Sequence, residues 1–463
     1  MRLASIAATL VLLSSCKVGP NYARPDVPKA PAYRGPDESQ VSSANSLADE
    51  KWWEVFKDPQ LQTLIRTALK QNYDVQIAAS RVLQAQQQVI ITRANEFPTL
   101  GVGPAVTGVK SPSIPGVFAG YSYLADALNL TPSWTPDFWG RYRRATEASR
   151  ATLRSTEWGQ RATLMSLVES LATAYFQLRE YDLELDIAKR TLDSRKQSLA
   201  LTQKLEKGGN TSMVDVEQAQ QLVEEAAEVI PQTEQAVQQE ENAISLLLGQ
   251  NPGPVPRGQP ITEQIDLDNV PAGLPSQLLE RRPDIQEAEQ NLVAANAEIG
   301  VARAQLFPSI SLTATAGVES IGLGNLFKWG ARAWTWTASA NQPIFNDGSL
   351  RANVRLSEAE KQQAVLTYQQ TIQTAFRQVS DALIANQKLR QYREHQEALT
   401  EATKESSNLA QIRYKGGVTS YLEVLTNDTN YFSAELTLAR ARLSERLAVV
   451  QLYNAMGGGW QQP

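Results

Sequence analysis

The residue types that most often carry chemistry are scarce in this sequence. Its 463 residues include one cysteine, Cys16, and one histidine, His395, which lies in a polar stretch and is expected at the surface. A single cysteine forms neither an intramolecular disulfide nor a cysteine-based zinc site, and a single histidine excludes a multi-histidine metal cluster. No nucleophile–base arrangement or phosphate loop is present, and "GVGP" at 101–104 lacks the third glycine of a dinucleotide motif. We therefore expect no catalytic residue, metal site, cofactor or enzymatic activity.

Cys16 has a position that suggests a different chemistry. Arg2 precedes a short apolar stretch at 3–13, and small residues follow, as in a secretory signal peptide. The motif "LSSC" at 13–16 looks like a bacterial lipobox, in which the cysteine thiol is alkylated by a diacylglyceryl group and the freed amine is acylated. We expect residues 1–16 to form a lipoprotein signal peptide that ends at the lipidated Cys16; the alternative is a chance cysteine. Lys17, in place of an aspartate, favours the outer membrane.

The composition narrows the class of protein further. The net charge of −5 does not suggest a nucleic-acid partner. The hydrophobic share of 42% is enough for a core, and the length allows two or three domains or one elongated unit. After the N-terminus no window approaches 18 consecutive apolar residues, so we expect no membrane-spanning helix.

Internal comparison divides the chain into two copies of one design. "NYDVQIAASRVLQAQQQVIITRANEFPTL" at 72–100 matches "RPDIQEAEQNLVAANAEIGVARAQLFPSI" at 282–310, and "KGGNTS" at 207–212 matches "KGGVTS" at 415–420. Such self-similarity predicts a tandem repeat. We expect an N-terminal segment at 17–71, repeat 1 at 72–249, an inter-repeat segment at 250–281, repeat 2 at 282–457 and a tail at 458–463.

Each repeat has the same expected order of elements: a helix, two strands, a very long helix, a tip and a return helix. In repeat 1 these are strands at about 99–109 and 124–134, a long helix at 141–207, a tip at 208–211 and a return helix at 212–248. In repeat 2 they are strands at about 309–319 and 333–343, a long helix at 349–415, a tip at 416–418 and a return helix at 419–456. At 1.5 Å per residue the long helices could each reach about 100 Å, a length typical of coiled coils and tubes. Pro231 is expected to interrupt and kink the first return helix.

The strand segments alternate between apolar and polar residues. "SISLTATAGV" at 309–318 and "AWTWTASANQP" at 333–343 have the length and two-residue period of transmembrane β-strands whose inner face meets water. The alternative is an amphipathic sheet on a soluble core. Five tryptophans at or near strand ends would form an interfacial aromatic girdle: Trp134, Trp139, Trp329, Trp334 and Trp336.

Four strands per chain are too few for a barrel. Transmembrane barrels need at least eight strands, because an open edge in lipid leaves backbone groups unpaired. Two copies would give eight strands and a filled interior, and three would give twelve strands with an aqueous lumen. The strand count therefore predicts an obligate oligomer.

Three segments carry a resemblance to a known family. "CKVGPNYARP" at 16–25, "WWEVFKDPQLQTLIRTAL" at 52–69 and "LPSQLLERRPDIQEAEQNLVAANAEIGVARAQLFPSISL" at 274–312 look like the outer membrane factor family. These are TolC-like channel proteins, and the sequence resembles their lipoprotein branch, called NodT-like or OprM-like. The resemblance covers essentially the whole chain.

The resemblance implies an α+β membrane protein that forms a homotrimer. Twelve strands would form one outer-membrane β-barrel, and twelve helices would continue it as a periplasmic α-helical barrel with a mixed equatorial region. Such a channel passively conducts drugs or other small molecules from an inner-membrane RND-type pump and a periplasmic adaptor, and it contributes to antibiotic resistance. The alternatives are an exit duct for type I protein secretion and a periplasmic scaffold lipoprotein without a pore. The sequence does not name the cargo, the pump or the adaptor.

The two tips are the candidate gate. Gly208, Gly209, Gly416 and Gly417 permit the positive φ values that let a helix stop and the next return. Thr211 or Ser212, and Thr419 or Ser420, could cap the return helices.

The resemblance adds gate residues at the tips. By motif position Asp215 and Glu423 match acidic gate sites of the family, and Tyr414 matches a gate tyrosine. Thr426 stands where many members carry an aspartate, and Thr419 where some carry an arginine or aspartate. Asp428, close to Thr426, is the candidate substitute. The electrostatics of the gate therefore depart from the family pattern.

Overall fold

The computed structural model describes residues 17–27, 33, 46–113, 115–116, 119–263 and 275–461. Cys16 and the signal peptide lie outside the described residues. The chain divides into two compact units. Unit 1 comprises Met1–Asp26, Arg81–Thr156 and Glu287–Tyr368, and unit 2 comprises Val27–Ser80, Glu157–Gln286 and Gln369–Pro463.

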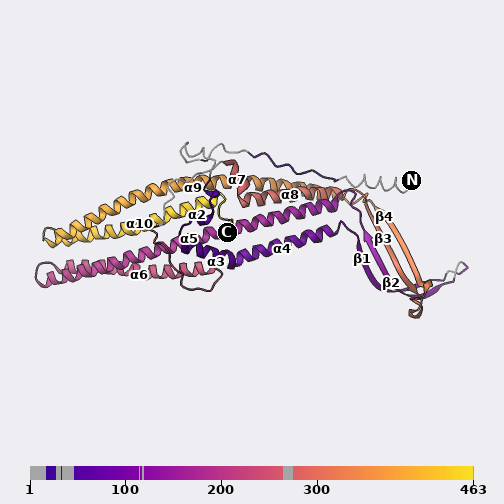
Figure 1. The fold of residues 1–463 in the computed structure, drawn as a ribbon, viewed down its shortest axis with the longest axis horizontal. Coiled ribbons are helices and arrows are strands. Elements are labelled where there is room, and N and C mark those ends of the chain that lie inside the picture. Colours follow the sequence, from indigo (N-terminus) through magenta and orange to yellow (C-terminus); the bar gives the residue numbers. More distant parts are fainter. Residues whose placement is uncertain are drawn as a thin grey trace. The chain divides into compact units, whose positions relative to one another are not determined.

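Unit 1 contains a four-stranded antiparallel sheet (Figure 1). The strands are β1 (Thr99–Ser111), β2 (Tyr121–Trp134), β3 (Ser309–Ser320) and β4 (Arg332–Asn341), in the order β1-β2-β3-β4. Each begins within three residues of the range expected from the alternating pattern. Because β2 pairs with β3, one continuous sheet joins the two repeats.

The pairing register gives the sheet two different faces. Val102 pairs with Leu130, Leu130 with Ala316, and Ala316 with Trp334, so these side chains form one row on one face. The apolar side chains of this face are those of Leu100, Val102, Pro104, Val106, Leu124, Leu128, Leu130, Pro132, Trp134, Ile310, Leu312, Ala314, Ala316, Val318, Trp334, Trp336, Ala338 and Ala340. The opposite face is richer in hydroxyl and small side chains, and the hydroxyls of Ser311 and Ser339 hydrogen-bond there at 2.7 Å.

The two outer strands each have a free edge. Within the described residues β1 pairs only with β2, and β4 pairs only with β3. Every residue of β4 is exposed. A long exposed strand edge is a template for pairing with another chain, so the sheet is incomplete as it stands.

Two antiparallel helical hairpins supply most of unit 2, and the first residues of their long helices, 141–156 and 349–368, belong to unit 1 (Figure 1). The first hairpin is α5 (Arg141–Lys207) and α6 (Met213–Leu247), and the second hairpin is α9 (Ser349–Lys415) and α10 (Tyr421–Ala455). The long helices have the bounds expected from the sequence, while the return helices are one or two residues shorter at each end. The expected interruption at Pro231 is wrong, because α6 continues through it. Proline removes only one intrahelical hydrogen bond, and the flanking turns retain theirs.

Shorter helices complete the two repeats. They are η1 (Leu47–Asp49), α2 (Trp52–Val55), α3 (Pro59–Gln71), α4 (Tyr73–Ala94), α7 (Pro275–Arg281) and α8 (Pro283–Ala304), with η2 (Leu323–Asn325) and η3 (Trp329–Ala331) between β3 and β4. Asp58 caps α3 through the backbone N–H groups of Gln60 and Leu61, and its carboxylate accepts a 2.7 Å bond from the buried Tyr175 hydroxyl. In the described part of the chain, no helix is both long and apolar enough to cross a bilayer.

Candidate functional site

Each tip turn is closed by the second glycine of its pair. Gly209 has φ +73° and Gly417 has φ +71°, in the left-handed region that favours glycine. The amides that follow the long helices bond back to carbonyls of the last turn, as in a Schellman motif: Asn210 N–H to Leu205 O at 2.9 Å and Val418 N–H to Arg413 O at 3.0 Å. Gly208 and Gly416 keep φ outside the left-handed region, so positive φ is required at only one glycine of each pair.

The two return helices begin differently. The Ser212 hydroxyl accepts a bond from the Asp215 N–H at 3.3 Å, and the Asp215 carboxylate accepts one from the Ser212 N–H, which makes a capping box. Ser420 holds the equivalent position before α10, but in the described structure its side chain makes no capping bond. Thr419 instead donates its hydroxyl to Glu423. The sequence prediction of capping residues is therefore right for Ser212 only.

A polar contact connects the two tips within one chain. The Tyr414 hydroxyl, at the end of α9, lies 3.3 Å from the Thr211 hydroxyl, which in turn donates to Asp215. The Tyr414 ring packs edge-on against Tyr421, with the centroids 5.2 Å apart. Two of the expected gate residues, Tyr414 and Asp215, are thus brought together through Thr211, a residue that the motif comparison did not single out as a gate residue.

Glu423 has a cationic neighbour on the opposite helix of its hairpin. The Arg413 guanidinium lies 3.2 Å from the Glu423 carboxylate, and both side chains are partly exposed. A cation this close offsets part of the charge of the Glu423 carboxylate.

Asp428 lies apart from this tip cluster. Its carboxylate is 2.8 Å from the Arg195 guanidinium on α5, and Arg195 also donates to the Leu222 carbonyl of α6 at 2.7 Å. Arg195 is only 2% exposed and lies over the Phe432 ring, 4.9 Å from its centroid. Asp428 therefore holds helices together, and the structure does not group it with Tyr414 and Glu423.

An apolar core supports the tips from behind. It consists of the buried residues Ala219, Leu222, Ala410, Tyr421 and Val424. Burial raises the pKa of the Tyr421 phenol above its ordinary value. One turn apart on α10, Leu422 and Thr426 point away from this core, and Leu422 is 56% exposed. Leu422 is a large apolar side chain at a tip surface, which the sequence analysis did not identify.

The sheet places three of the expected girdle tryptophans on its apolar face. Trp134 lies at the last residue of β2, and Trp334 at the third residue of β4. Trp336 is the fifth of the ten residues of β4, so it lies in the middle of the strand and not, as expected, at or near its end. The strand continues for five more residues because the apolar alternation persists through Ala338 and Ala340. Trp329 lies in η3, beyond the strand.

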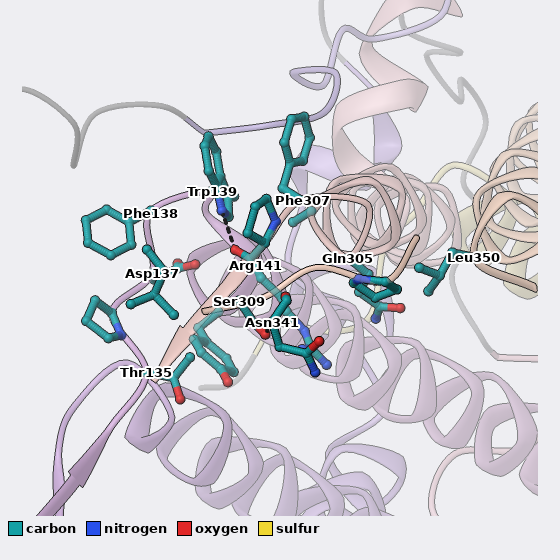
Figure 2. Close-up of a pocket in the computed structure, with 16 residues that line it drawn as sticks. Thr135, Asp137, Phe138, Trp139, Arg141, Gln305, Phe307, Ser309, Asn341 and Leu350 are labelled. Atoms are coloured by element: carbon teal, nitrogen blue, oxygen red, sulfur yellow. Dashed lines mark hydrogen bonds between the residues drawn. The ribbon is translucent and has the colours of Figure 1, made fainter. Parts of the chain in front are cut away.

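Trp139 contacts its own chain where β2 leads into α5. Its indole N–H donates to the Pro308 carbonyl at 2.8 Å, and its ring stacks on Phe307 with the centroids 4.8 Å apart (Figure 2). These residues border a cavity of about 240 Å³ that also contacts Asp137, Arg141 and Asn341. Trp139 is thus half-buried by protein, unlike the freely exposed Trp334.

The segment after Cys16 is held against unit 1. The Val18 N–H donates to the Trp139 carbonyl at 3.1 Å, and Lys17 forms an ion pair with Glu147. The buried guanidinium of Arg144 donates to the carbonyls of Val18 and Gly19.

The described residues contain no group of three or more His, Cys, Asp or Glu side chains arranged to hold a metal ion. His395 is exposed on α9, as expected for a surface residue.

Comparison with known proteins gives a consistent family match. A family profile described as outer membrane efflux protein matches residues 64–250 and again 274–458, once per repeat. The toluene efflux pump outer membrane protein TtgC of Pseudomonas putida is 38% identical over 99% of this chain and 96% of its own length. The cation efflux system protein CusC of Escherichia coli (strain K12) is 35% identical over 96% of this chain and 97% of its own.

Solved structures agree with the fold over nearly the full chain. A structure of CusC has a TM-score of 0.85 at 34% identity and covers 96% of this chain and 100% of its own. The open state of the MtrE outer membrane channel of Neisseria gonorrhoeae has a TM-score of 0.87 at 31% identity, covering 96% of this chain and 99% of its own.

Proposed function

Because the chain belongs to the outer membrane efflux protein family, we propose how its sheet, hairpins and tips serve an efflux channel. The chain is an outer-membrane channel subunit of a tripartite efflux system, as its relatives are. This family consists of channel proteins. What remains to be proposed is the assembly, the gate, the cargo and the anchor.

We propose that three chains close one twelve-stranded barrel. The observation that carries this proposal is the open sheet with one apolar face and two free edges. Pairing β4 of one copy with β1 of the next satisfies every edge, which lipid demands. From Ile310 to Val318 the apolar face extends about 26 Å along the strand at about 3.3 Å per residue. With the strand tilt of about 35–45° found in transmembrane barrels, this length corresponds to a height of about 19–22 Å, most of the apolar band of about 25 Å.

The assembly is tested by native mass spectrometry and by planar-bilayer recording of the purified full-length protein. We expect a particle of about three times the mass of one chain that gives discrete conductance steps. A monomer, or a trimer that never conducts, would contradict the proposed barrel and favour a scaffold without a pore.

We propose that the tips close the channel at rest. The Tyr414–Thr211 contact joins the two hairpins of each chain, and the Arg413–Glu423 pair joins the two helices of the second hairpin, so together they favour one arrangement of the tips. A partner that binds the tips more tightly in another arrangement shifts the population toward it. Such a partner is a periplasmic adaptor, which connects the channel to an inner-membrane RND-type pump.

The cargo is proposed to be small molecules chosen by the pump. The relatives carry names that refer to toluene, to antibiotics and to cations, at similar identities to this chain. Chains of such similar sequence serving unlike cargo indicate that selection lies elsewhere in the assembly. Crosslinking in cells, followed by mass spectrometry of the co-purified adaptor and pump, tests the partners, and recovery of neither would contradict the proposal.

We propose that Cys16 carries a lipid anchor in the outer membrane. The support is the lipobox sequence together with the contacts that hold Lys17 and Val18 on unit 1. Cys16→Ser is expected to abolish incorporation of radiolabelled palmitate and lipoprotein processing, while a Ser15→Ala control leaves both intact. Label on the Cys16→Ser protein would refute the anchor.

A further inference from the structure

The loop between β3 and β4 presents an unusual surface. Residues 321–331 join the far ends of these strands, away from the ends that follow α8 and precede α9. This β3–β4 loop exposes four large apolar side chains to more than 70% each. They are Ile321 at 74%, Leu323 at 71%, Phe327 at 79% and Trp329 at 78%.

The loop that exposes these side chains has a regular backbone conformation. Two short 3₁₀ turns close it through Asn325 N–H to Gly322 O at 2.9 Å and Ala331 N–H to Lys328 O at 3.0 Å. Leu326 is buried, with 7% exposure, and so fixes the loop against the protein. Because its neighbour Phe327 is then directed outward, the loop presents its apolar side chains in a defined arrangement.

The charged residues of the loop are all basic. Residues 321–332 contain Lys328 and Arg332 and no aspartate or glutamate. The Arg332 guanidinium lies over the Trp329 ring, 3.5 Å from its centroid. Aromatic and basic side chains side by side are typical of protein surfaces at the boundary between acyl chains and anionic headgroups.

The loop also lies at the edge of the apolar face of the sheet. Trp334 pairs with Ala316, and Arg332 pairs with Val318, one row farther along the same face. On the next row Asp126 pairs with Ser320, so on β2 and β3 polar side chains replace the apolar ones there, while Val106 of β1 in the same row is still apolar. Arg332 and Trp329 therefore stand where a membrane spanned by this sheet would meet water. Asp126, the nearest acidic group on that face, lies one row beyond Arg332.

We propose that the β3–β4 loop binds phosphate-bearing lipids at the cell-exterior surface of the outer membrane. The aromatic and aliphatic side chains enter the acyl boundary, and Lys328 and Arg332 contact lipid phosphates. The proposal rests on the membrane-spanning sheet proposed above. Charge complementarity selects an anionic lipid surface over the other possible occupant, a second copy of the loop, which would place these cations against one another.

The test uses the full-length protein in vesicles, labelled at one engineered cysteine with an environment-sensitive fluorophore. Phe327→Cys reports on the loop, Trp336→Cys on the apolar face and Thr337→Cys on the opposite face. Wild-type protein treated with the same reagent controls for Cys16. The vesicles contain phosphatidylcholine and a spin-labelled quencher lipid, with or without phosphatidylglycerol.

We expect quenching at 327 and 336 and little at 337, with more quenching at 327 when phosphatidylglycerol is present. Adding Lys328→Gln and Arg332→Gln to the Phe327→Cys protein is expected to remove that increase and leave the channel conductance unchanged. An increase that survives these substitutions would refute the role of the cations.

Two other outcomes separate this inference from the proposed barrel. Quenching at 336 without quenching at 327 overturns lipid binding by the loop and leaves the barrel standing. Absence of quenching at both 336 and 327 contradicts the membrane-spanning sheet itself. A pyrene label at 327 that gives excimer emission identifies a second copy as the occupant, which also overturns the inference.

Discussion

The guanidinium of Arg195 on α5 lies 2.8 Å from the carboxylate of Asp428 on α10, and this buried ion pair joins the first hairpin to the second. Arg195 is 2% exposed, and the Asp428 side chain is 13% exposed. Arg195 also reaches the Leu222 carbonyl and lies 3.6 Å from Glu225, both on α6. From α5, this one side chain therefore contacts two other hairpin helices, α6 and α10, behind the tips.

Replacement of Arg195 is expected to lower the stability of the protein. Arg195→Met leaves Asp428 buried without its cation, a change that typically costs about 3–5 kcal/mol. The double variant Arg195→Met with Asp428→Leu is expected to lose less stability, because it removes both members of the ion pair and leaves no buried carboxylate without its cation. The temperature at which the proposed trimer dissociates measures the loss of stability in both variants. Arg377→Ala, which breaks an exposed pair with Asp381, is the control and is expected to change stability by about 0–1 kcal/mol. A double variant no more stable than the single one would contradict this account.

The tip contact predicts a paired effect on the resting channel. Tyr414→Phe and Thr211→Val each remove the same hydroxyl contact, which contributes about 0.5–1.5 kcal/mol net. We expect each to raise single-channel conductance without adaptor. Because Thr211→Val also removes the bond to Asp215, the double variant is expected to match Thr211→Val alone. Effects that add in full would place the two hydroxyls in separate interactions.

Charge at the tip gives a further prediction. Tyr414→Phe combined with Glu423→Ala is expected to leave the trimer intact, raise conductance, weaken the resting selectivity for cations and admit vancomycin to cells. The selectivity change is expected to be partial, because Arg413 already offsets part of the carboxylate charge. Conductance, selectivity and vancomycin sensitivity all equal to wild type, at equal trimer levels, would show that these residues are not the gate.

The two glycines of the second tip are expected to respond differently to alanine. Gly417→Ala forces a side chain into the left-handed region and is expected to cost about 1–2 kcal/mol. Gly416→Ala meets only ordinary contacts, the nearest at 3.5 Å, and is expected to be neutral or slightly stabilising. Thermal dissociation of the two variants, measured side by side, checks the difference, and equal losses would contradict the turn geometry.

Glu180 makes the stability of the helical unit depend on pH. Burial, followed by the charge of Glu184, raises the pKa of its carboxyl from 4.5 to about 8, and Arg440 lies 2.8 Å from Glu184. Because the folded state holds this proton more tightly than the unfolded state, the free energy of unfolding falls as pH rises from about 4.5 to about 8. Glu180→Gln is expected to remove that part of the dependence, so its advantage over wild type grows across this range. The exposed Glu217→Gln control is expected to follow wild type, and a Glu180→Gln profile parallel to wild type would refute the assignment.

The faces of β4 give a prediction about insertion. Trp336 lies at mid-strand on the apolar face, so Trp336→Lys is expected to cost about 2–4 kcal/mol near the bilayer midplane. Thr337→Lys, one residue along on the opposite face, is expected to cost much less. The yield of heat-modifiable trimer on gels compares them, and equal losses would reverse or abolish the assigned faces.

The bounds of helices, strands and caps, which depend on residues close together in the sequence, could be predicted from the sequence. The stretch 349–415 contains no glycine or proline and ends at a Gly-Gly pair, and α9 has those bounds. The two-residue alternation likewise located all four strands. The spacing of Ser212 and Asp215 is that of a capping box, and the structure contains one.

The contacts of the site could not be predicted in this way. Thr211 and Tyr414 are 203 positions apart, and Arg195 and Asp428 are 233 apart. Whether such residues meet depends on how each hairpin is rotated about its axis. The hydrophobic pattern defines that rotation only loosely, because these helices have apolar residues on more than one side. The position of Trp336 shows the same limit, because the sequence pattern located the strand but not the place of the tryptophan within it.

The free edges of β1 and β4 also affect how the number of assembled channels in a cell depends on the concentration of the single chain. If three chains must meet before these edges are paired, the yield at low expression follows the cube of the chain concentration. Halving expression then lowers the number of channels about eightfold by mass action. A substitution that slightly reduces the supply of chain would therefore reduce efflux by about three times that fraction, even though the interior of every assembled channel is unchanged.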